Sequence, residues 1–212
     1  MADQPILVVR GEASREVPPE LAVFLVTVAA RGKDRESTLA DLTGRAAVAR
    51  AALDRYADAV ERRETSAVSV HPEVKRRGER VSVYVGTVTT TVTVPDFDVL
   101  GELMLHLAGL DWTGVSGPWW QLRPGNTAGA DIRRAAVADA LDRARQYADA
   151  VGARVARLVE LRDESAGAGR PYLARASFDG GGETPELVVD PQAQTVSAAV
   201  VVRVAITEPV LD

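Results

Sequence analysis

The sequence predicts an α+β protein of two α/β lobes, one of them ferredoxin-like, with long antiparallel strands and amphipathic helices packed on the sheets. Two observations lead to this class. Stretches at 21–30, 81–94 and 196–206 have the valine- and threonine-rich composition of strands. Between them, segments within 34–60 and 126–152 repeat apolar residues every three to four positions, as amphipathic helices do.

The composition is that of an ordinary globular protein. Of the 212 residues, 46% are hydrophobic and 26% are charged, which allows a packed core. Cysteine does not occur, which excludes disulfides, thiolate nucleophiles and thiolate metal sites. The net charge of -5 argues against a general nucleic-acid binder, because phosphate contacts need an extended basic surface.

The sequence predicts neither an export signal nor a membrane span. The segment Met1 to Ile6 has no basic region followed by an apolar one, and a strand-like run begins at Ile6. The longest uninterrupted apolar runs, such as 21–26, are far shorter than the roughly 20 residues that cross a bilayer. We therefore expect a cytoplasmic protein.

The first lobe is predicted over about residues 20–123. The apolar stretch at 21–30 is expected to be a buried, central strand. Asp34 and Ser37 are candidate caps of a helix whose apolar positions continue to Val60. Alanine at the middle positions of this helix favours packing on a sheet over a coiled coil.

A hairpin is predicted next. Residues 65–74 alternate as a half-exposed strand, and 81–94 form its partner, with Gly86 as a candidate bulge or bend. The second strand is longer than a typical strand, and an unpaired edge of that length would invite aggregation unless another element or chain covered it. One of its faces is polar and carries Thr87, Thr89 and Thr91.

A short helix that ends near Gly109 and a strand over 112–123 complete the first lobe. The resulting β-α-β-β-α-β order is that of a ferredoxin-like lobe. Trp119 and Trp120 are expected to point to opposite faces of the last strand, so that a helix, the second lobe or another subunit must cover one of them. The predicted interaction surface consists of Trp112, Trp119, Trp120, Thr87, Thr89 and Thr91.

The second lobe is predicted to be discontinuous, from about 4–12 and 126–208, so that 4–208 form a single domain. Its helix at 129–151 carries a stripe of alanines, and its sheet would join the two ends of the chain. Strands are expected near 154–161 and 195–207. Between these strands lies a loop at 163–194, rich in glycine and proline, with a candidate short strand at 186–189.

No catalytic, cofactor-binding or metal-binding residues are predicted. His71 and His106 are far apart in the sequence, and neither belongs to a spaced metal motif. Glu102 and His106 could share a helix face, but no third ligand is evident. The basic turn at 75–80 is expected to keep its hairpin solvated, and Gly180 to Gly182 are not followed by the helix that a phosphate loop needs.

Several short motifs, taken in order across nearly the whole chain, resemble the SIMPL domain, a mainly bacterial family of largely uncharacterised function. They are Val9-Arg-Gly-Glu-Ala13, Val17-Pro-Pro-Glu-Leu-Ala22, Val68-Ser-Val-His-Pro72, Tyr84-Val-Gly-Thr87, the segment 96–103, Ala135-Ala-Val-Ala-Asp-Ala140 and the tail at 196–202. The resemblance implies an α+β fold, a tendency to form homo-oligomers, and links to the cell envelope and stress responses in some members. It supplies no catalytic residues.

Two functions follow as hypotheses. The favoured one is a non-enzymatic assembly or interaction protein that forms homo-oligomers and binds no cofactor and no nucleic acid. The alternative is a small-ligand-binding protein or weak hydrolase that uses a cleft between the lobes under the loop at 163–194, with Glu183 and Asp190 as participants. The first is preferred because the sequence positions no base, nucleophile or metal set.

Overall fold

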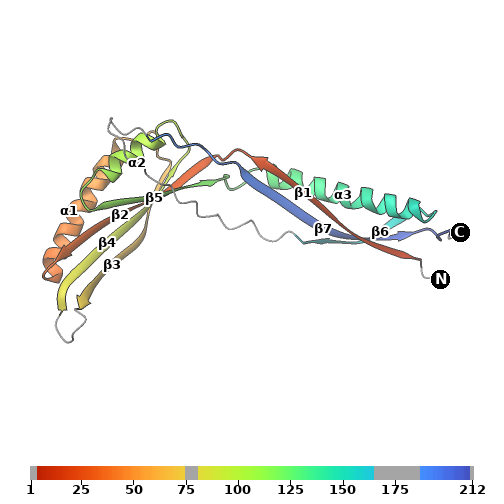
Figure 1. Cartoon of the computed structure of the whole chain (residues 1–212), viewed down its shortest axis with the longest axis horizontal. Coiled ribbons are helices and arrows are strands. Elements are labelled where there is room, and N and C mark those ends of the chain that lie inside the picture. The colour runs from red at the N-terminus through yellow and green to blue at the C-terminus, as the bar shows by residue number, and fades with distance from the viewer. Residues whose placement is uncertain (1–3, 75–80, 165–186, 211–212) are drawn as a thin grey trace. The chain divides into compact units, whose positions relative to one another are not determined.

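The computed structural model describes residues 4–74, 81–164 and 187–210 (Figure 1). These residues form an α+β fold with two antiparallel sheets, as predicted. Two compact units divide the chain, and each has its own hydrophobic core. One unit takes its described residues from Pro19–Leu122 and Pro171–Gln192, and the other takes them from Met1–Pro18, Arg123–Arg170 and Ala193–Asp212.

The first unit, here called the four-stranded unit, has the predicted β-α-β-β-α-β order. Its elements are β2 (Leu21–Gly32), α1 (Arg35–Asp54), β3 (Arg62–Val74), β4 (Val81–Val94), α2 (Leu100–Ala108) and β5 (Thr113–Gln121). The strands lie in the order β3-β4-β2-β5, and neighbouring strands are antiparallel. β2 is thus the interior strand that its sequence predicts, although only one of its faces is fully buried.

β4 has the predicted bounds, but it is not a sheet edge. It pairs with β2 on one side and with β3 on the other, so β3 and β5 form the edges. Gly86, a candidate bulge or bend, is not a bulge, because it pairs in register with Ala30 and Val70. A Cβ at Gly86 would lie 3.0 Å from Cδ2 of Leu42, so the glycine makes room for α1.

α1 begins as predicted and ends early. Asp34 is its N-cap, and its carboxylate accepts a hydrogen bond of 2.8 Å from the Ser37 amide. The helix ends at Asp54 and does not reach Val60. The amides of Arg55 and Tyr56 bond to carbonyls three residues back, which tightens the last turn.

The core of the four-stranded unit lies on one face of its sheet. α1 and α2 both pack on this face, where their apolar residues meet those of β2 and β4 (Figure 1). Phe24, Leu100 and Leu103 are fully buried there. Leu187 and Val189 also pack against this core. A strand was expected from Glu186 to Val189, but residues 187–189 have no regular secondary structure, and Glu186 lies outside the described residues.

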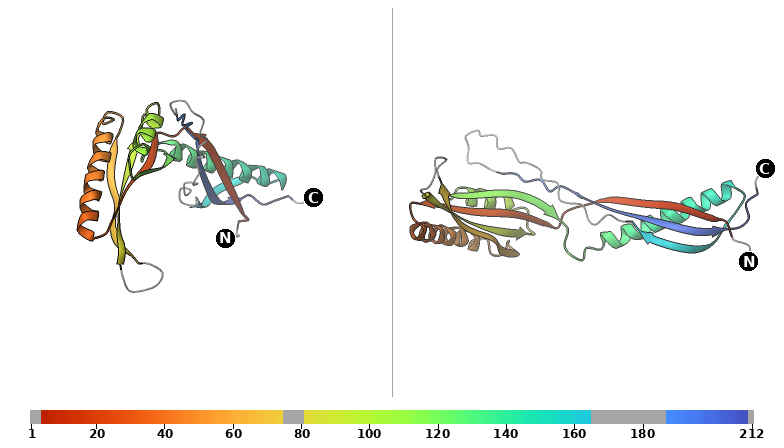
Figure 2. Two further views of the ribbon diagram at one scale, coloured as in Figure 1. Left: turned by 60° about the vertical axis from the view of Figure 1, so that its left-hand side comes forward. Right: turned by 90° about the horizontal axis from the view of Figure 1, so that it is seen from below.

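The second unit, here called the three-stranded unit, joins the two ends of the chain in one sheet, as predicted. Its elements are β1 (Ile6–Val17), α3 (Ala128–Ala150), β6 (Val155–Asp163) and β7 (Gln194–Ile206). The strand order is β1-β7-β6, with both pairs antiparallel (Figure 2). The alanine stripe of α3 is buried against β1 and β7, and its small side chains let helix and sheet approach closely.

Within the described residues, no helix combines the length and the apolar character needed to cross a membrane.

Candidate interaction surface

The four-stranded sheet has a second face, opposite α1 and α2, which we call the threonine face. Residues directly across from each other in neighbouring strands share a sheet face. The register therefore places Leu25 beside Thr91, Thr27 beside Thr89, and Ala29 beside Thr87 on this face. The same register adds Val23, Ala67, Ser69, Thr93, Ser116 and Trp119, with charged residues toward the ends; of these, Thr93 is buried.

Hydroxyl groups connect the strands across the threonine face. Thr27 Oγ1 and Thr89 Oγ1 share a hydrogen bond of 3.2 Å between β2 and β4. Ser69 Oγ and Thr87 Oγ1 share one of 2.9 Å between β3 and β4. Because β-branched threonine is stiff at χ1 and these hydroxyls already have partners, the methyl groups are held in fixed positions. The face is therefore an ordered surface before any partner binds.

Charged side chains lie at the rim of the threonine face and not at its centre. From Val23 to Ala29, β2 contributes only apolar residues and one threonine. At one end Arg31 pairs with Glu73 at 2.6 Å, and near the other end Glu64 of β3 pairs with Arg62 at 3.2 Å. The centre is thus neutral, and the neighbouring charges have partners of opposite sign.

The structure brings together four of the six residues predicted as an interaction surface. Thr87, Thr89, Thr91 and Trp119 lie on the threonine face. The two other tryptophans lie elsewhere. The three tryptophans therefore do not share one surface, contrary to the prediction.

Trp120 points to the helix-covered face, as the alternation with Trp119 predicts, and its ring packs edge-on against Phe97 at 5.0 Å. Trp112 precedes β5 with a positive φ of 57°, which turns it out of the strand. Its ring lies under the guanidinium of Arg45 at 4.7 Å, and Arg45 Nη1 donates a hydrogen bond of 2.8 Å to the Ala29 carbonyl. Trp112 is thereby tied to α1, although it remains 55% exposed.

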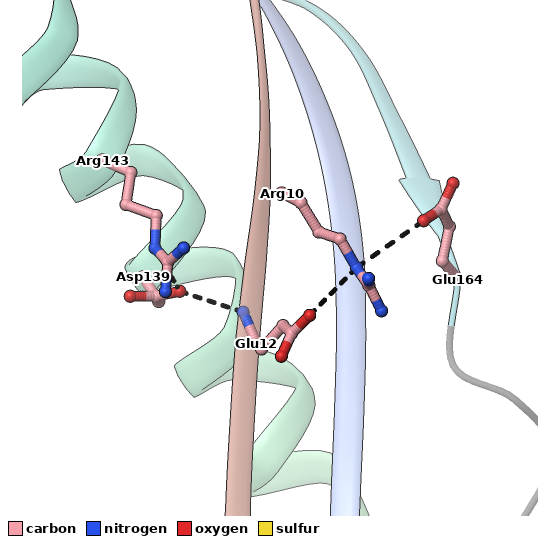
Figure 3. Close-up of polar contacts among 5 residues, drawn as sticks. All are labelled: Arg10, Glu12, Asp139, Arg143 and Glu164. Atoms are coloured by element: carbon pink, nitrogen blue, oxygen red, sulfur yellow. Dashed lines mark hydrogen bonds and ion pairs between the residues drawn. The ribbon is translucent and has the colours of Figure 1, made fainter.

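A polar cluster in the three-stranded unit was not anticipated in full (Figure 3). The sequence predicts an ion pair between Asp139 and Arg143, and the structure contains it at 3.0 Å. The same carboxylate accepts a hydrogen bond of 2.9 Å from the Glu12 amide of β1. This amide is the first cause, and Arg143 a further one, of a lowered pKa at Asp139. The contact depends on β1 being an edge strand, which the sequence does not reveal.

The rest of this cluster consists of ion pairs on exposed side chains. Arg10 Nε lies 3.1 Å from a Glu12 carboxylate oxygen and 3.9 Å from one of Glu164 (Figure 3). The i,i+4 spacing of Arg145 and Asp149 also predicts an ion pair, but Arg145 pairs instead with Asp142, three residues before it. Each named carboxylate has a cation or an amide beside it, so the cluster links β1 to α3 and to the residue after β6, and none of these carboxylates is a free acid or base.

Glu102 and His106 do share a helix face, and Tyr56 occupies it. The Tyr56 hydroxyl donates a hydrogen bond of 2.8 Å to Glu102, and its ring lies 6.0 Å from that of His106. The hydrogen bond to Glu102, followed by burial, raises the pKa of Tyr56. In the described part of the chain, no group of three or more metal-ligating side chains comes together.

Several residues singled out in the sequence lie outside the described ranges, among them Gly180 to Gly182 and most of the loop at 163–194. The basic turn at 75–80 and Glu183 lie outside the described residues. Asp190, the second acid proposed for a ligand site, is described and is exposed.

Comparisons with known proteins identify a family without a known activity. The family model described as SIMPL, a protein of unknown function, matches residues 7–204. No curated protein matches.

Solved structures show weak similarity. An uncharacterized protein from Thermotoga maritima is 15% identical, with 47% of this chain and 98% of that one covered, at a TM-score of 0.24. A putative amidohydrolase/peptidase from Burkholderia cenocepacia is 16% identical, with 65% of this chain and 36% of that one covered, at a TM-score of 0.27. An uncharacterized conserved protein from Listeria innocua is 17% identical over 92% of each chain, at a TM-score of 0.19.

Proposed function

This chain belongs to the SIMPL family of unknown function, and from that premise we propose that it is a non-enzymatic assembly module whose copies associate through the threonine face. The observation that carries the proposal is that the sheet is covered on one side. α1 and α2 pack on the opposite face, and no described helix or strand packs on the threonine face. Leu25 and Trp119 on this face are only half-buried.

A second copy of the same face is the partner that this surface fits. Sheets pack face to face in β-sandwiches, and a two-fold dimer places the same patch on both partners. Because the centre of the threonine face carries no charge, two copies can meet without repulsion. Four strands about 4.8 Å apart and a paired length of about 35 Å give the face on the order of 600 Å², close to the ~800 Å² that one partner contributes to a standard interface.

The carboxylates with displaced pKa values support a non-enzymatic role. The pKa values of Asp34, Asp139 and Glu160 are all lowered. Asp34 caps α1, Asp139 binds β1, and Glu160 accepts hydrogen bonds from Arg162 and Arg203. A general acid near neutral pH requires a raised pKa, so these three carboxylates, which are bonded within the fold, do not suit that role.

Light scattering coupled to size-exclusion chromatography over micromolar concentrations tests the proposal. We expect the natural chain to exceed the monomer mass and Thr89→Arg to return it to the monomer, because the added charge would be buried at the centre of the interface. Ala51→Arg adds the same charge to the exposed side of α1 and should leave the mass unchanged. A natural chain that is monomeric throughout this range would refute self-assembly.

A further inference from the structure

A groove of ≈ 720 Å³ lies on the helix-covered face of the four-stranded sheet, between α1 and the strands β2, β4 and β3. Its volume falls within the range of roughly 300–1,000 Å³ that is usual for small-molecule sites. The groove lies on the opposite side of the sheet from the threonine face, and the assembly proposed above does not use it.

The groove exists because α1 covers β2 and leaves β3 uncovered. Val28, Val88 and Val68 form a row across β2, β4 and β3 on this face. Val28 is 3% exposed and Val68 is 65% exposed, with Val88 between them. Opposite this row, α1 presents Ala46 and Ala47, whose side chains are too short to fill the space.

A contact between α1 and the sheet marks each end of the groove. At one end Leu42 packs over Gly86. At the other end Arg63 of β3, which lies opposite Val92, forms an ion pair of 2.6 Å with Asp54 at the end of α1. Gly86 and Val92 are six positions apart along β4, so at about 3.3 Å per residue the groove is about 20 Å long. An elongated groove of this kind suits an extended chain better than a compact ring.

The two ends differ in polarity. Leu39 and the valine row line the end near Gly86, whereas Arg50 and Arg63 line the other end. The charge of Arg63 is balanced by Asp54. Arg50 has no ion-pair partner among the described residues, so its guanidinium is available to an anion. A ligand that complements the groove therefore has a long apolar part and one anionic group at its end.

We propose that this groove binds a long-chain fatty acid, with the alkyl chain over the valine row and the carboxylate beside Arg50. The alkyl chain would cover Val68 and Val88, which the protein leaves partly exposed to water. The carboxylate would complete the charge pairing at the Arg50 end.

The test is displacement of a dansyl-labelled fatty acid from the full chain by palmitate, below the concentration at which palmitate forms micelles. Palmitate should compete with the label, and Ala46→Phe should weaken binding of both by at least about tenfold, because the ring would fill the groove. Ala51→Phe makes the same exchange on the exposed side of α1 and should bind like the natural chain. Thermal unfolding of both variants confirms that they fold.

A second variant tests the carboxylate without changing the shape of the groove. Arg50→Gln should raise the Kd for palmitate about five- to tenfold and leave that of the neutral palmityl alcohol unchanged. Arg35→Gln, at the exposed start of α1, should change neither. A natural chain that does not bind the label, or binding that Ala46→Phe and Arg50→Gln both leave intact, would overturn the proposal. Thr89→Arg should bind palmitate normally, so this test is independent of self-assembly.

Discussion

At Gly11 the backbone of β1 lies close to the backbone of α3. A Cβ at this position would lie 2.3 Å from the carbonyl oxygen of Ala136 and 2.4 Å from the amide nitrogen of Ala140. Both are backbone atoms, which cannot move aside without shifting the helix. Gly44 is the opposite case, because nothing lies within 4 Å of its Cβ position on the exposed side of α1.

These surroundings predict opposite effects of the same substitution. Gly11→Ala should lower the free energy of unfolding by about 1–3 kcal/mol, because α3 must move away from the sheet. Gly44→Ala should raise it by about 0.5–1 kcal/mol, because alanine loses less backbone entropy in a helix. Urea denaturation measures both changes, and a Gly11→Ala protein as stable as the natural one would contradict the close approach.

The lowered pKa of Asp139 predicts a pH-dependent contribution to stability. A carboxyl whose pKa is lower in the folded chain stabilises the fold above its unfolded pKa, and this contribution is lost as the pH falls through the folded pKa. Asp139→Asn should therefore lower the free energy of unfolding at about pH 7, and its difference from the natural chain should close as the pH falls below 3.8.

Urea denaturation over a pH series measures this difference. Arg143→Gln should have the smaller effect at neutral pH, because the Glu12 amide is the largest cause of the shift at Asp139. A difference between natural chain and Asp139→Asn that stays constant down to the lowest pH would count against this role.

At the scale of elements, the position of a strand in its sheet matters more than its length. β4 bonds to neighbours along both edges, whereas β3, among the described strands, bonds only to β4 and has an irregular register near Thr65. β3 is also exposed over most of its length. Its charged ends, which include Arg62 and Glu73, and its register shifts are features that discourage further pairing at a sheet edge.

The rate of amide hydrogen exchange distinguishes β4 from β3. Amides of β4 should exchange much more slowly than those of β3, because an interior strand is released only when the sheet opens. Mass spectrometry of peptides from 62–72 and 84–94 measures this. Equal rates, or slower exchange in β3, would show that β4 is not the interior strand.

At the scale of the whole molecule, the two units have separate cores. The buried cluster of the three-stranded unit shares no residue with the clusters of the four-stranded unit. All three tryptophans belong to the four-stranded unit, so intrinsic fluorescence reports on that unit alone. α3, which has the longest span of the three described helices, lies in the other unit and contributes to circular dichroism.

This separation predicts that variants act on different signals. Gly11→Ala should shift the unfolding transition seen by circular dichroism more than the one seen by tryptophan fluorescence. Leu103→Ala, in the core of the four-stranded unit, should destabilise the fluorescence-detected transition by about 2–5 kcal/mol. Identical shifts of both signals in both variants would indicate a single cooperative transition.

Local pattern predicted most elements of the fold. The bounds of β4, the end of α2 at Gly109 and the alanine stripe of α3 follow from side-chain periodicity and from capping residues, which act within a few positions along the chain. The alternation of Trp119 and Trp120 likewise followed from the period of a strand. α1 was predicted too long, because the apolar residues Tyr56 and Val60 continue its periodicity after its backbone has turned.

The sequence by itself thus determined where the three helices and the seven strands of the described residues lie, apart from the end of α1 and an extra strand at 186–189, together with the family to which the chain belongs. Only the tertiary structure decided that β4 is interior, that Asp139 meets the Glu12 amide, that Trp112 turns toward α1, and that α1 leaves a groove beside β3. The physical reason is the separation along the chain of the residues that interact. Periodicity reflects neighbours a few residues apart, whereas strand order and the space between a helix and a sheet depend on contacts between residues far apart in the chain.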